Sequence, residues 1–318
     1  MIKSLKELYI ERIRMQKGGQ GSGNFGHAGR PGEIGGSGEG GGSTATEEKP
    51  KERYFVSEKP IVEVEFNGKP LNPNGKSTEG MYMDENGNYT KERVEMNNVI
   101  TNKMFEGKTP VEKPVAYLMG GGPASGKSEA VKQGLVKLPE NIVNINPDTY
   151  KVCYPEYKKM VEEGNVKRAS PFCHEESSDF SKVALKRGIQ GNYNVLMDGT
   201  GDNSVENLEK KVDLMRSGGH SIVANYMTVD VEEAAKRAID REEKTGRHVD
   251  EPYLRATYKS LSEVVPAAIA RGLYDKFTMW DNSFEDRIPR AIATAVGKEL
   301  TILDKERWDK FLSGKDKK

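Results

Sequence analysis

The chain has 318 residues, and its 49 basic and 49 acidic side chains cancel to a formal net charge of zero. A balanced chain has no overall positive field to attract nucleic acid, so a nucleic-acid partner is not favoured. Two cysteines cannot form a disulfide framework, and no apolar run reaches the length of a membrane span. We therefore expect a soluble cytoplasmic protein with no membrane partner.

The first 52 residues differ in composition from the rest. Residues 1–17 place apolar side chains at helical spacing among charged ones, which predicts a short amphipathic helix that could dock on a partner or on this protein's own body. Residues 18–52 are rich in glycine, which predicts a flexible linker because ordering glycine costs conformational entropy. Within it, GNFGHAGRPGEIGGSG resembles a glycine-rich sequence of phage-encoded proteins, and that resemblance implies a phage origin.

Residues 53–113 predict a small α+β extension that packs on the domain after it. The alternating stretch RYFVSEKPIVEVEFNG is typical of a half-buried strand, and turn signals follow at NPNG and ENGN. A helix is expected at about 90–105. The residues of this extension indicate no function.

From residue 114 to 318 apolar strands alternate with helices, which predicts an α/β domain. Strands are expected in VAYLMG, NIVNINP, NVLMDGT, SIVANYMTVD and KFTMWDN, and helices over about 150–163, 174–190, 231–244 and 252–271. This pattern predicts the three-layer P-loop NTPase fold with a mainly parallel sheet. Ligands on such a sheet bind outside the carboxyl ends of the strands.

The strongest motif is GGPASGKS, which fits G-x-x-x-x-G-K-[ST] between an apolar strand and a helix. Its glycines let backbone N–H groups wrap a phosphate chain, and the start of the helix adds partial positive charge. We expect Lys127 to bridge the β- and γ-phosphates and the Ser128 hydroxyl to coordinate Mg²⁺. ATP and Mg²⁺ are thus the expected cofactors. The expected nucleotide-binding residues are Gly121, Gly122, Pro123, Ala124, Ser125, Gly126, Lys127, Ser128 and Glu129.

Two carboxylates follow neighbouring strands of the expected sheet. Asp148 follows the second strand and Asp198 ends the third, so both should face the γ-phosphate of a bound nucleotide. We interpret Asp148 as the general base that orients the acceptor hydroxyl, and Asp198 as the acid that holds magnesium or binds the acceptor. The alternatives are a helix N-cap for Asp148 and an Asp-Gly turn for Asp198.

The segment AIDREEKTGRHVDEPYL predicts a lid that carries Arg241 and Arg247. Guanidinium groups arriving from a lid can neutralise the charge of the transferring phosphoryl group, although a solvated helix face is the alternative. Such a lid favours a small-molecule kinase over a motor ATPase. Glu176 opens a helix in FCHEESSDF and is expected to contact the acceptor, unless it only complements the helix dipole.

Taken together, GGPASGKS, NPDTYK, HEESS, VLMDGTG and DREEKTGR resemble, in order and spacing over about 110–285, the zeta-toxin family of P-loop kinases. The resemblance implies phosphorylation of the 3′-hydroxyl of UDP-N-acetylglucosamine. It matches Lys127 and Ser128 to the Walker A pair and Asp148 to the base. Asp198 and Thr200 match the substrate-side turn, and Arg241 and Arg247 match the lid arginines. Asp198 stands where some members have Glu, and Asp202 stands where a basic residue can occur.

Other functions stay open at this point. The chain could phosphorylate another small acceptor or a nucleic-acid end, or it could be a virion-associated protein that uses the domain structurally. The family resemblance leaves room for an antitoxin partner. The expected location is the cytoplasm of a bacterial host cell, with association with a phage particle as the alternative.

Overall fold

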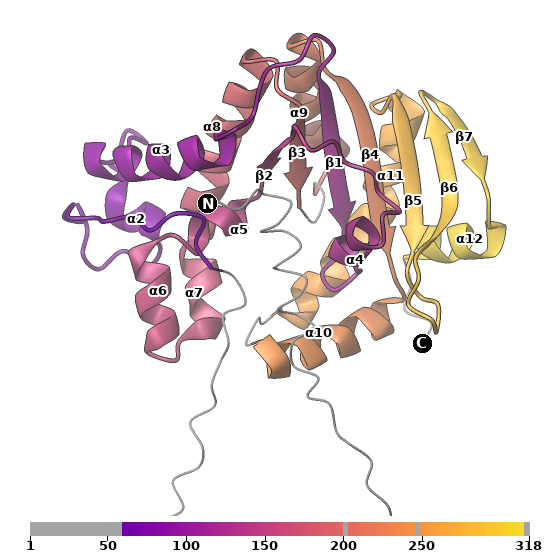
Figure 1. Ribbon diagram of the computed structural model, residues 1–318. Helices are drawn as coiled ribbons and strands as arrows, with labels where there is room; N and C mark the ends of the chain where they lie inside the picture. The colour runs from indigo at the N-terminus through magenta and orange to yellow at the C-terminus, as the bar shows by residue number, and fades with distance from the viewer. Residues whose placement is uncertain (1–58, 200–202, 246–248, 315–318) are drawn as a thin grey trace, which may run out of the picture.

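A seven-stranded sheet organises the computed structural model, which describes residues 59–199, 203–245 and 249–314 (Figure 1). Its strand order is β2-β3-β1-β4-β5-β6-β7, in which β1 to β5 run parallel and β6 and β7 are antiparallel additions at one edge. This confirms the predicted α/β fold with a mainly parallel sheet. The strands are β1 Val115–Gly121, β2 Val143–Ile145, β3 Val195–Asp198, β4 Ser221–Thr228, β5 Lys276–Asp281, β6 Arg290–Val296 and β7 Glu299–Ile302.

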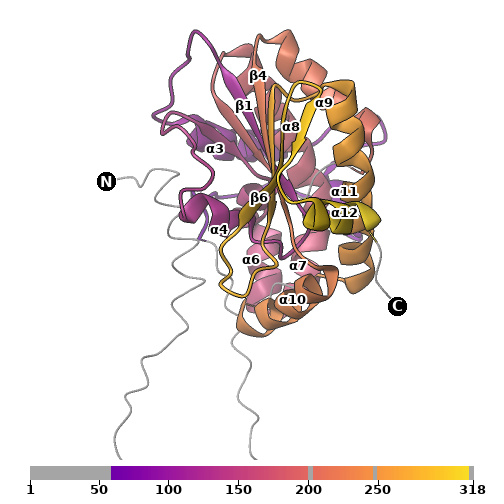
Figure 2. The same ribbon diagram turned by 90° about the vertical axis from the view of Figure 1, so that its right-hand side faces the viewer.

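Helices cover both faces of this sheet. Figure 2 shows the sheet nearly edge-on, with α4 on one side and α9, α11 and α12 on the other. The helices are α2 Thr78–Tyr82, α3 Lys91–Phe105, α4 Lys127–Lys132, α5 Pro147–Lys151, α6 Pro155–Glu162, α7 Val166–Phe172, α8 His174–Gln190, α9 Val205–Ser217, α10 Val231–Thr245, α11 Glu251–Arg271 and α12 Lys305–Ser313. The helix expected at 150–163 is broken between α5 and α6, because the residue before Pro155 is disfavoured in a helical conformation.

Alternate strand residues build two separate cores, as the period of two in a strand requires. On β1, Ala116 and Leu118 belong to a large cluster with α3, α8, α9, α11 and α12. Met119, with Tyr117 packed beside it, belongs to a smaller cluster with α4 and the segment after it. Helix α4 has only six residues, because Gly134 follows its C-cap with a positive φ of 72° and ends the helix. Both faces of the sheet are therefore covered, and a ligand would bind at the carboxyl ends of its strands.

Of the strand expected in residues 53–68, only residues 59–68 lie within the described part of the chain, and they do not form a ladder with any other described segment. Between residues 59 and 113 the structure has two helices and an isolated bridge between Met83 and Tyr89. The alternating pattern nevertheless has a structural basis, because Val62, Val64 and Phe66 turn inward on an extended chain that lies against the large core. Helix α3 matches the helix expected at 90–105 and contributes its own buried face to that core.

Both cysteines serve as packing residues. Cys153 and Cys173 are free and buried. Burial raises the pKa of the Cys153 thiol to about 11, and burial likewise raises the pKa of Cys173. Neither thiol is therefore a reactive nucleophile near neutral pH.

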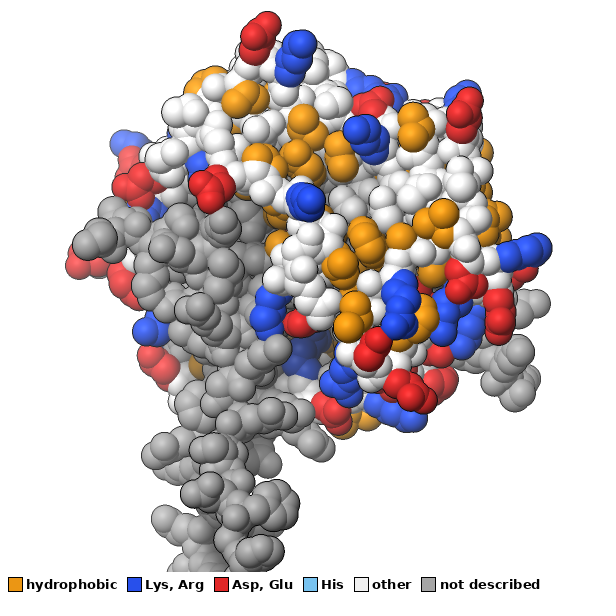
Figure 3. Space-filling model, turned by 45° about the vertical axis from the view of Figure 1, so that its right-hand side comes forward, with side chains coloured by type: hydrophobic (Ala, Val, Ile, Leu, Met, Phe, Trp, Pro, Cys, Tyr) orange, Lys and Arg blue, Asp and Glu red, His pale blue; other side chains and the backbone are white. Residues whose placement is uncertain are grey.

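The surface mixes charges of both signs. On the face shown in Figure 3, basic and acidic side chains are interspersed, with hydrophobic side chains between them. The edge strand β7 leaves all four of its residues exposed. Of the helices within the described ranges, none combines the length and the apolar character needed to cross a bilayer.

Candidate active site

The GGPASGKS segment forms a tight loop between β1 and α4. Its backbone needs left-handed conformations at several points, with φ of 140° at Gly121, 60° at Ala124 and 91° at Gly126. Neighbours also leave no room for side chains at the glycines. A Cβ on Gly122 would lie 2.2 Å from the Tyr258 ring, and one on Gly126 would lie 2.0 Å from Nδ2 of Asn282. The glycines are thus required both by conformation and by packing.

Two side chains from distant segments hold this loop. The Tyr258 hydroxyl on α11 donates to the carbonyl of Pro123 at 3.0 Å, and Nδ2 of Asn282 donates to the carbonyl of Ser125 at 3.1 Å. Asn282 follows β5 directly and is 3% exposed. These two hydrogen bonds fix two carbonyls of the loop, so contacts within the protein set the shape of the loop.

Gly126→Ala is expected to weaken ATP binding by at least tenfold and to destabilise the fold by about 1–3 kcal/mol, because the methyl group meets Asn282 and the positive φ is strained. Titration calorimetry and chemical unfolding measure the two effects. Gly134→Ala is the matched control, since Gly134 also has positive φ but its added Cβ meets nothing within 4 Å. Wild-type ATP affinity in the Gly126 variant would show that the loop does not cradle the nucleotide.

Helix α4 starts at Lys127, whose ammonium stays at the loop. Its Nζ donates to the carbonyls of Gly121 at 2.7 Å and Gly122 at 3.3 Å. Ser128 follows in the first turn of α4 and is half-buried, and the Glu129 carboxylate accepts a hydrogen bond from Gln133. A cation and a hydroxyl therefore lie at the end of β1, where the motif predicts a phosphate chain and its metal.

The two predicted aspartates lie at the same sheet edge, and one asparagine hydrogen-bonds to both residues. Asp198 ends β3 directly beside Met119 of β1, and Asp148 lies in the first turn of α5 after β2. Asn146 links them: its Oδ1 accepts from the Asp148 N–H at 2.9 Å, and its Nδ2 donates to Oδ2 of Asp198 at 3.4 Å. Asn146 is thus the N-cap of α5, a role that the sequence analysis gave as the alternative for Asp148. The Asp148 carboxylate is therefore left for another role.

The Asp148 side chain is 31% exposed and accepts a hydrogen bond from Lys151 at 2.9 Å. Lys151 is itself held by Ser170 at 3.2 Å. Asp198 is 8% exposed. One carboxylate is therefore accessible to an acceptor molecule, while the other lies deeper, beside the strand that leads into the loop.

Helix α10 lies beyond the carboxyl ends of the strands, with α6 and α7 near the same end (Figure 1). Lys167 of α7 pairs with Glu242 of α10 at 2.6 Å. Arg237 on α10 donates to the carbonyl of Asn282 at 3.0 Å, which joins this helix to the turn that holds the loop.

Arg241 lies one turn further along α10 and is half-buried. Burial raises the pKa of the Tyr258 hydroxyl, and the positive charges of Arg237 and Arg241 act against that rise. Arg237 contacts the residue that holds the loop, and Arg241, four residues later, lies on the same side of α10. Thr200 and Arg247 fall outside the described residues, so their predicted roles stay predictions.

Glu176 is fully buried rather than directed to an acceptor. Arg93 donates to both of its carboxylate oxygens, at 2.6 and 2.8 Å, and Asn97 donates to one of them at 2.8 Å. A carboxylate with no exposed surface and with three hydrogen bonds inside the protein does not reach an acceptor molecule. We correct the expectation accordingly: Glu176 holds α8 against α3.

A magnesium site of the expected kind needs few protein ligands, because water and phosphate oxygens complete the shell. Within the part of the chain that the structure describes, no three His, Cys, Asp or Glu side chains gather to hold a metal by themselves. Ser128 and Asp198 fit the pattern of a hydroxyl and one carboxylate that would share the ion with a nucleotide.

Sequence reasoning missed three residues that shape the site: Asn146, Tyr258 and Asn282. The Asn146-Pro147 dipeptide did carry a signal, since an asparagine before a proline at the first helical position is a frequent N-cap. Tyr258 and Asn282 contact the loop across more than 130 positions of sequence, and local patterns do not reveal such contacts.

The sequence also matches known proteins over its α/β domain. The Zeta toxin family model matches residues 99–285, more than half of the chain. Toxin zeta of Streptococcus pyogenes is 26% identical over 167 residues, 51% of this chain and 56% of that protein. Toxin zeta of Enterococcus hirae is 30% identical over 102 residues, 31% of this chain and 34% of that protein. The matches thus span about half, or less, of these relatives.

Solved structures show the same fold. The structure reported for the PezAT chromosomal toxin-antitoxin system of Streptococcus pneumoniae matches with a TM-score of 0.53 and 18% identity, over 72% of this chain and 91% of that chain. The AvrRxo1-ORF1:AvrRxo1-ORF2 structure with ATP matches with a TM-score of 0.56 and 15% identity, over 76% of this chain and 83% of that chain.

Proposed function

Because the chain belongs to the Zeta toxin family, we propose that it is an ATP-dependent kinase that phosphorylates a hydroxyl of a sugar nucleotide, with the 3′-hydroxyl of UDP-N-acetylglucosamine as the first candidate acceptor. One observation carries the proposal: two carboxylates of different accessibility lie at the sheet edge that also bears the glycine-rich loop, and Asn146 connects the carboxylate of Asp198 to the backbone of Asp148. Phosphoryl transfer needs this combination of a phosphate cradle, an acid for the metal and a base for the acceptor.

On the nucleotide side, the backbone N–H groups of residues 121–129 would bind the phosphates of ATP. Lys127 would exchange its bonds to the loop carbonyls for phosphate oxygens. Ser128 and Asp198 would hold Mg²⁺, which when bound offsets charge on the β- and γ-phosphates. Tyr258 and Asn282 keep the loop in shape for this purpose.

On the acceptor side, Asp148 would accept the proton of the attacking hydroxyl. The bond from that oxygen to the γ-phosphorus forms while the bond from phosphorus to the bridging oxygen of ADP breaks, and the proton moves to the Asp148 carboxylate. Lys151 and Ser170 fix the carboxylate's position without closing it off from solvent. Thr200, in the turn after Asp198, would contribute a hydroxyl to the same acceptor.

The lid arginines complete the proposed mechanism. Arg241, with Arg247 beyond it on the chain, would neutralise charge on the transferring phosphoryl group. An antitoxin partner is part of the proposal, supported by the fold shared with a protein of a toxin-antitoxin system. Action in the bacterial cytoplasm and a phage origin follow from the family and from the glycine-rich segment, and we propose them on those grounds.

The test is incubation of the full chain with γ-labelled ATP, magnesium and a panel of sugar nucleotides, beside Lys127→Ala. The expected result is label on UDP-N-acetylglucosamine that the variant fails to transfer. Label on another sugar nucleotide or on a nucleic-acid end would keep the kinase and overturn the acceptor. Tight ATP binding with no labelled acceptor and no ADP formed would overturn the kinase and favour a structural role in a phage particle.

A further inference from the structure

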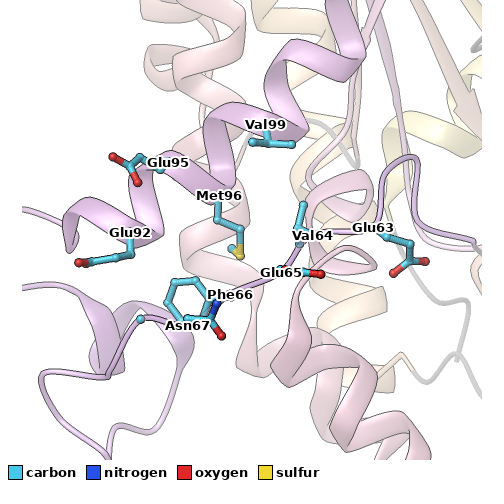
Figure 4. Close-up of a pocket in the computed structure, with 10 residues that line it drawn as sticks. Glu63, Val64, Glu65, Phe66, Asn67, Glu92, Glu95, Met96 and Val99 are labelled. Carbon is cyan, nitrogen blue, oxygen red and sulfur yellow. The ribbon is translucent and has the colours of Figure 1, made fainter.

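An open groove runs along α3, away from the P-loop. Two hollows of about 370 and 450 Å³ lie beside this helix, and they adjoin at Val99, which lines both of them. We call it the α3 groove; its first part lies between α3 and residues 63–68. In Figure 4, Met96 extends from α3 toward Phe66, with Val64 close by. Val99 is 48% exposed, so the groove offers apolar surface to a ligand.

The rim of the first part is acidic. It carries the four glutamates Glu63, Glu65, Glu92 and Glu95, all of them exposed. Glu63 pairs with Lys158, and Glu95 lies 3.8 Å from Lys91 on an open helix surface. An apolar floor with a rim of this charge fits an amphipathic segment that is basic on its polar face, and it repels anionic ligands.

We propose that residues 1–17 of this same chain dock in the α3 groove. Their sequence, MIKSLKELYIERIRMQK, has five basic and two acidic side chains, opposite in sign to the rim. Their apolar residues recur at helical spacing, as a helix laid in a groove requires. These are Ile2, Leu5, Leu8, Tyr9 and Ile13.

The lengths agree as well. Helix α3 has 15 residues, and at 1.5 Å per residue it extends over about 22 Å. Residues 2–15, if helical, would extend over about 21 Å by the same rise. The segment would therefore occupy the groove along its length, with apolar side chains over Met96 and Val99 and basic ones near Glu65 and Glu92.

The connection permits docking within one molecule. The described chain starts at residue 59, four positions before Glu63 on the groove rim. The predicted glycine-rich linker of residues 18–52 would have a root-mean-square span of about 33 Å, which would let the segment return to the rim. Tethering of this kind gives an effective concentration on the order of millimolar, so even a weak contact is well populated.

Disulfide trapping in the full chain tests the proposal. Leu8→Cys is combined with Val99→Cys in the groove or, as the control, with Ile302→Cys on β7, because Val99 and Ile302 are similarly exposed at 48% and 43%. The native cysteines are buried and do not compete. Under mild oxidation the groove pair is expected to form an intramolecular disulfide about tenfold faster than the control pair, detected by peptide mass spectrometry. Equal rates, or disulfides mainly between two molecules, would overturn intramolecular docking.

A charge reversal tests the electrostatic part. Glu65→Lys with Glu92→Lys, added to the groove pair, is expected to slow trapping roughly fivefold, since two attractive contacts become repulsive. Glu285→Lys with Glu299→Lys changes the net charge equally on exposed residues outside the groove and should leave the rate unchanged. Unchanged trapping in the groove variant, with an unaltered melting temperature, would overturn the recognition by charge.

Discussion

Asp148→Asn is expected to slow phosphoryl transfer by about 10²- to 10⁴-fold and to leave ATP affinity within about twofold of the wild type. The substitution keeps the size of the side chain and its contact with Lys151, but the amide cannot take the proton of the acceptor hydroxyl. Asn146 continues to cap α5 through the backbone N–H of residue 148, so the local fold is retained. Single-turnover rates with labelled ATP and equilibrium titration of the nucleotide give the two quantities.

The matched control for this variant is Asp309→Asn, because Asp309 also pairs with a lysine of its own helix, Lys305 on α12. Asp309→Asn should change neither the rate of phosphoryl transfer nor the affinity for ATP. A wild-type transfer rate for Asp148→Asn would remove Asp148 as the base. Parallel losses in transfer and in ATP affinity would instead assign it to the architecture of the nucleotide site.

Arg93→Met is expected to lower the free energy of unfolding by about 3–5 kcal/mol, the largest stability effect among the side chains considered. Arg93 is fully buried and meets Glu176 and Glu156, with its guanidinium also over the rings of Tyr82 and Tyr154. Burial lowers the pKa of Arg93, but the hydrogen bonds and negative charges of Glu176 and Glu156 together outweigh burial, so the pKa is raised and the charge persists. Removing the cation leaves the Glu176 carboxylate buried without its partner.

Urea unfolding of a double-mutant cycle distinguishes this account from simple loss of packing. Glu176→Met alone should cost less than Arg93→Met, because Glu156 still pairs with Arg93. The double variant should cost clearly less than the two single losses combined, because Glu176 is then no longer left without its partner. Arg271→Met is the surface control: Arg271 also binds two glutamates, Glu206 and Glu209, but is exposed, so a loss of only about 0–1 kcal/mol is expected. Additive losses in the cycle would contradict the ion-pair explanation.

Much of the fold could be predicted from the sequence because the parallel strands β1 to β5 are short apolar runs bounded by turn residues. Residues 59–68 show the limit of that reasoning. Their alternation reflects real burial on one side, but a strand also needs a hydrogen-bonding neighbour, and an alternating pattern does not reveal whether one exists. The antiparallel pair β6–β7 was not predicted either, and β7 has no buried residue to mark it.

Some residues of the candidate site could likewise be predicted from the sequence, and others could not. Lys127, Asp148 and Asp198 could be placed from motif and strand position, because the carboxyl ends of parallel strands share one edge. The role of Glu176 could not be assigned correctly, since its partner Arg93 lies 83 positions earlier in the chain. The pair buries a glutamate that, in the sequence, looks like an ordinary acidic residue at the start of a helix. Asn282 is a similar case, because its role depends on the Ser125 carbonyl 157 positions away.

Asn282 also has a consequence for how nucleotide and lid influence each other. Its carbonyl is held by Arg237 of α10, and its side chain holds the loop that would bind the phosphates. A ligand that shifted α10 through this connection would alter phosphate affinity, and phosphate would shift α10 by the same free energy, because linkage is reciprocal. A protein bound only to the outer surface of α10 would thus compete with ATP or cooperate with it without ever touching the nucleotide.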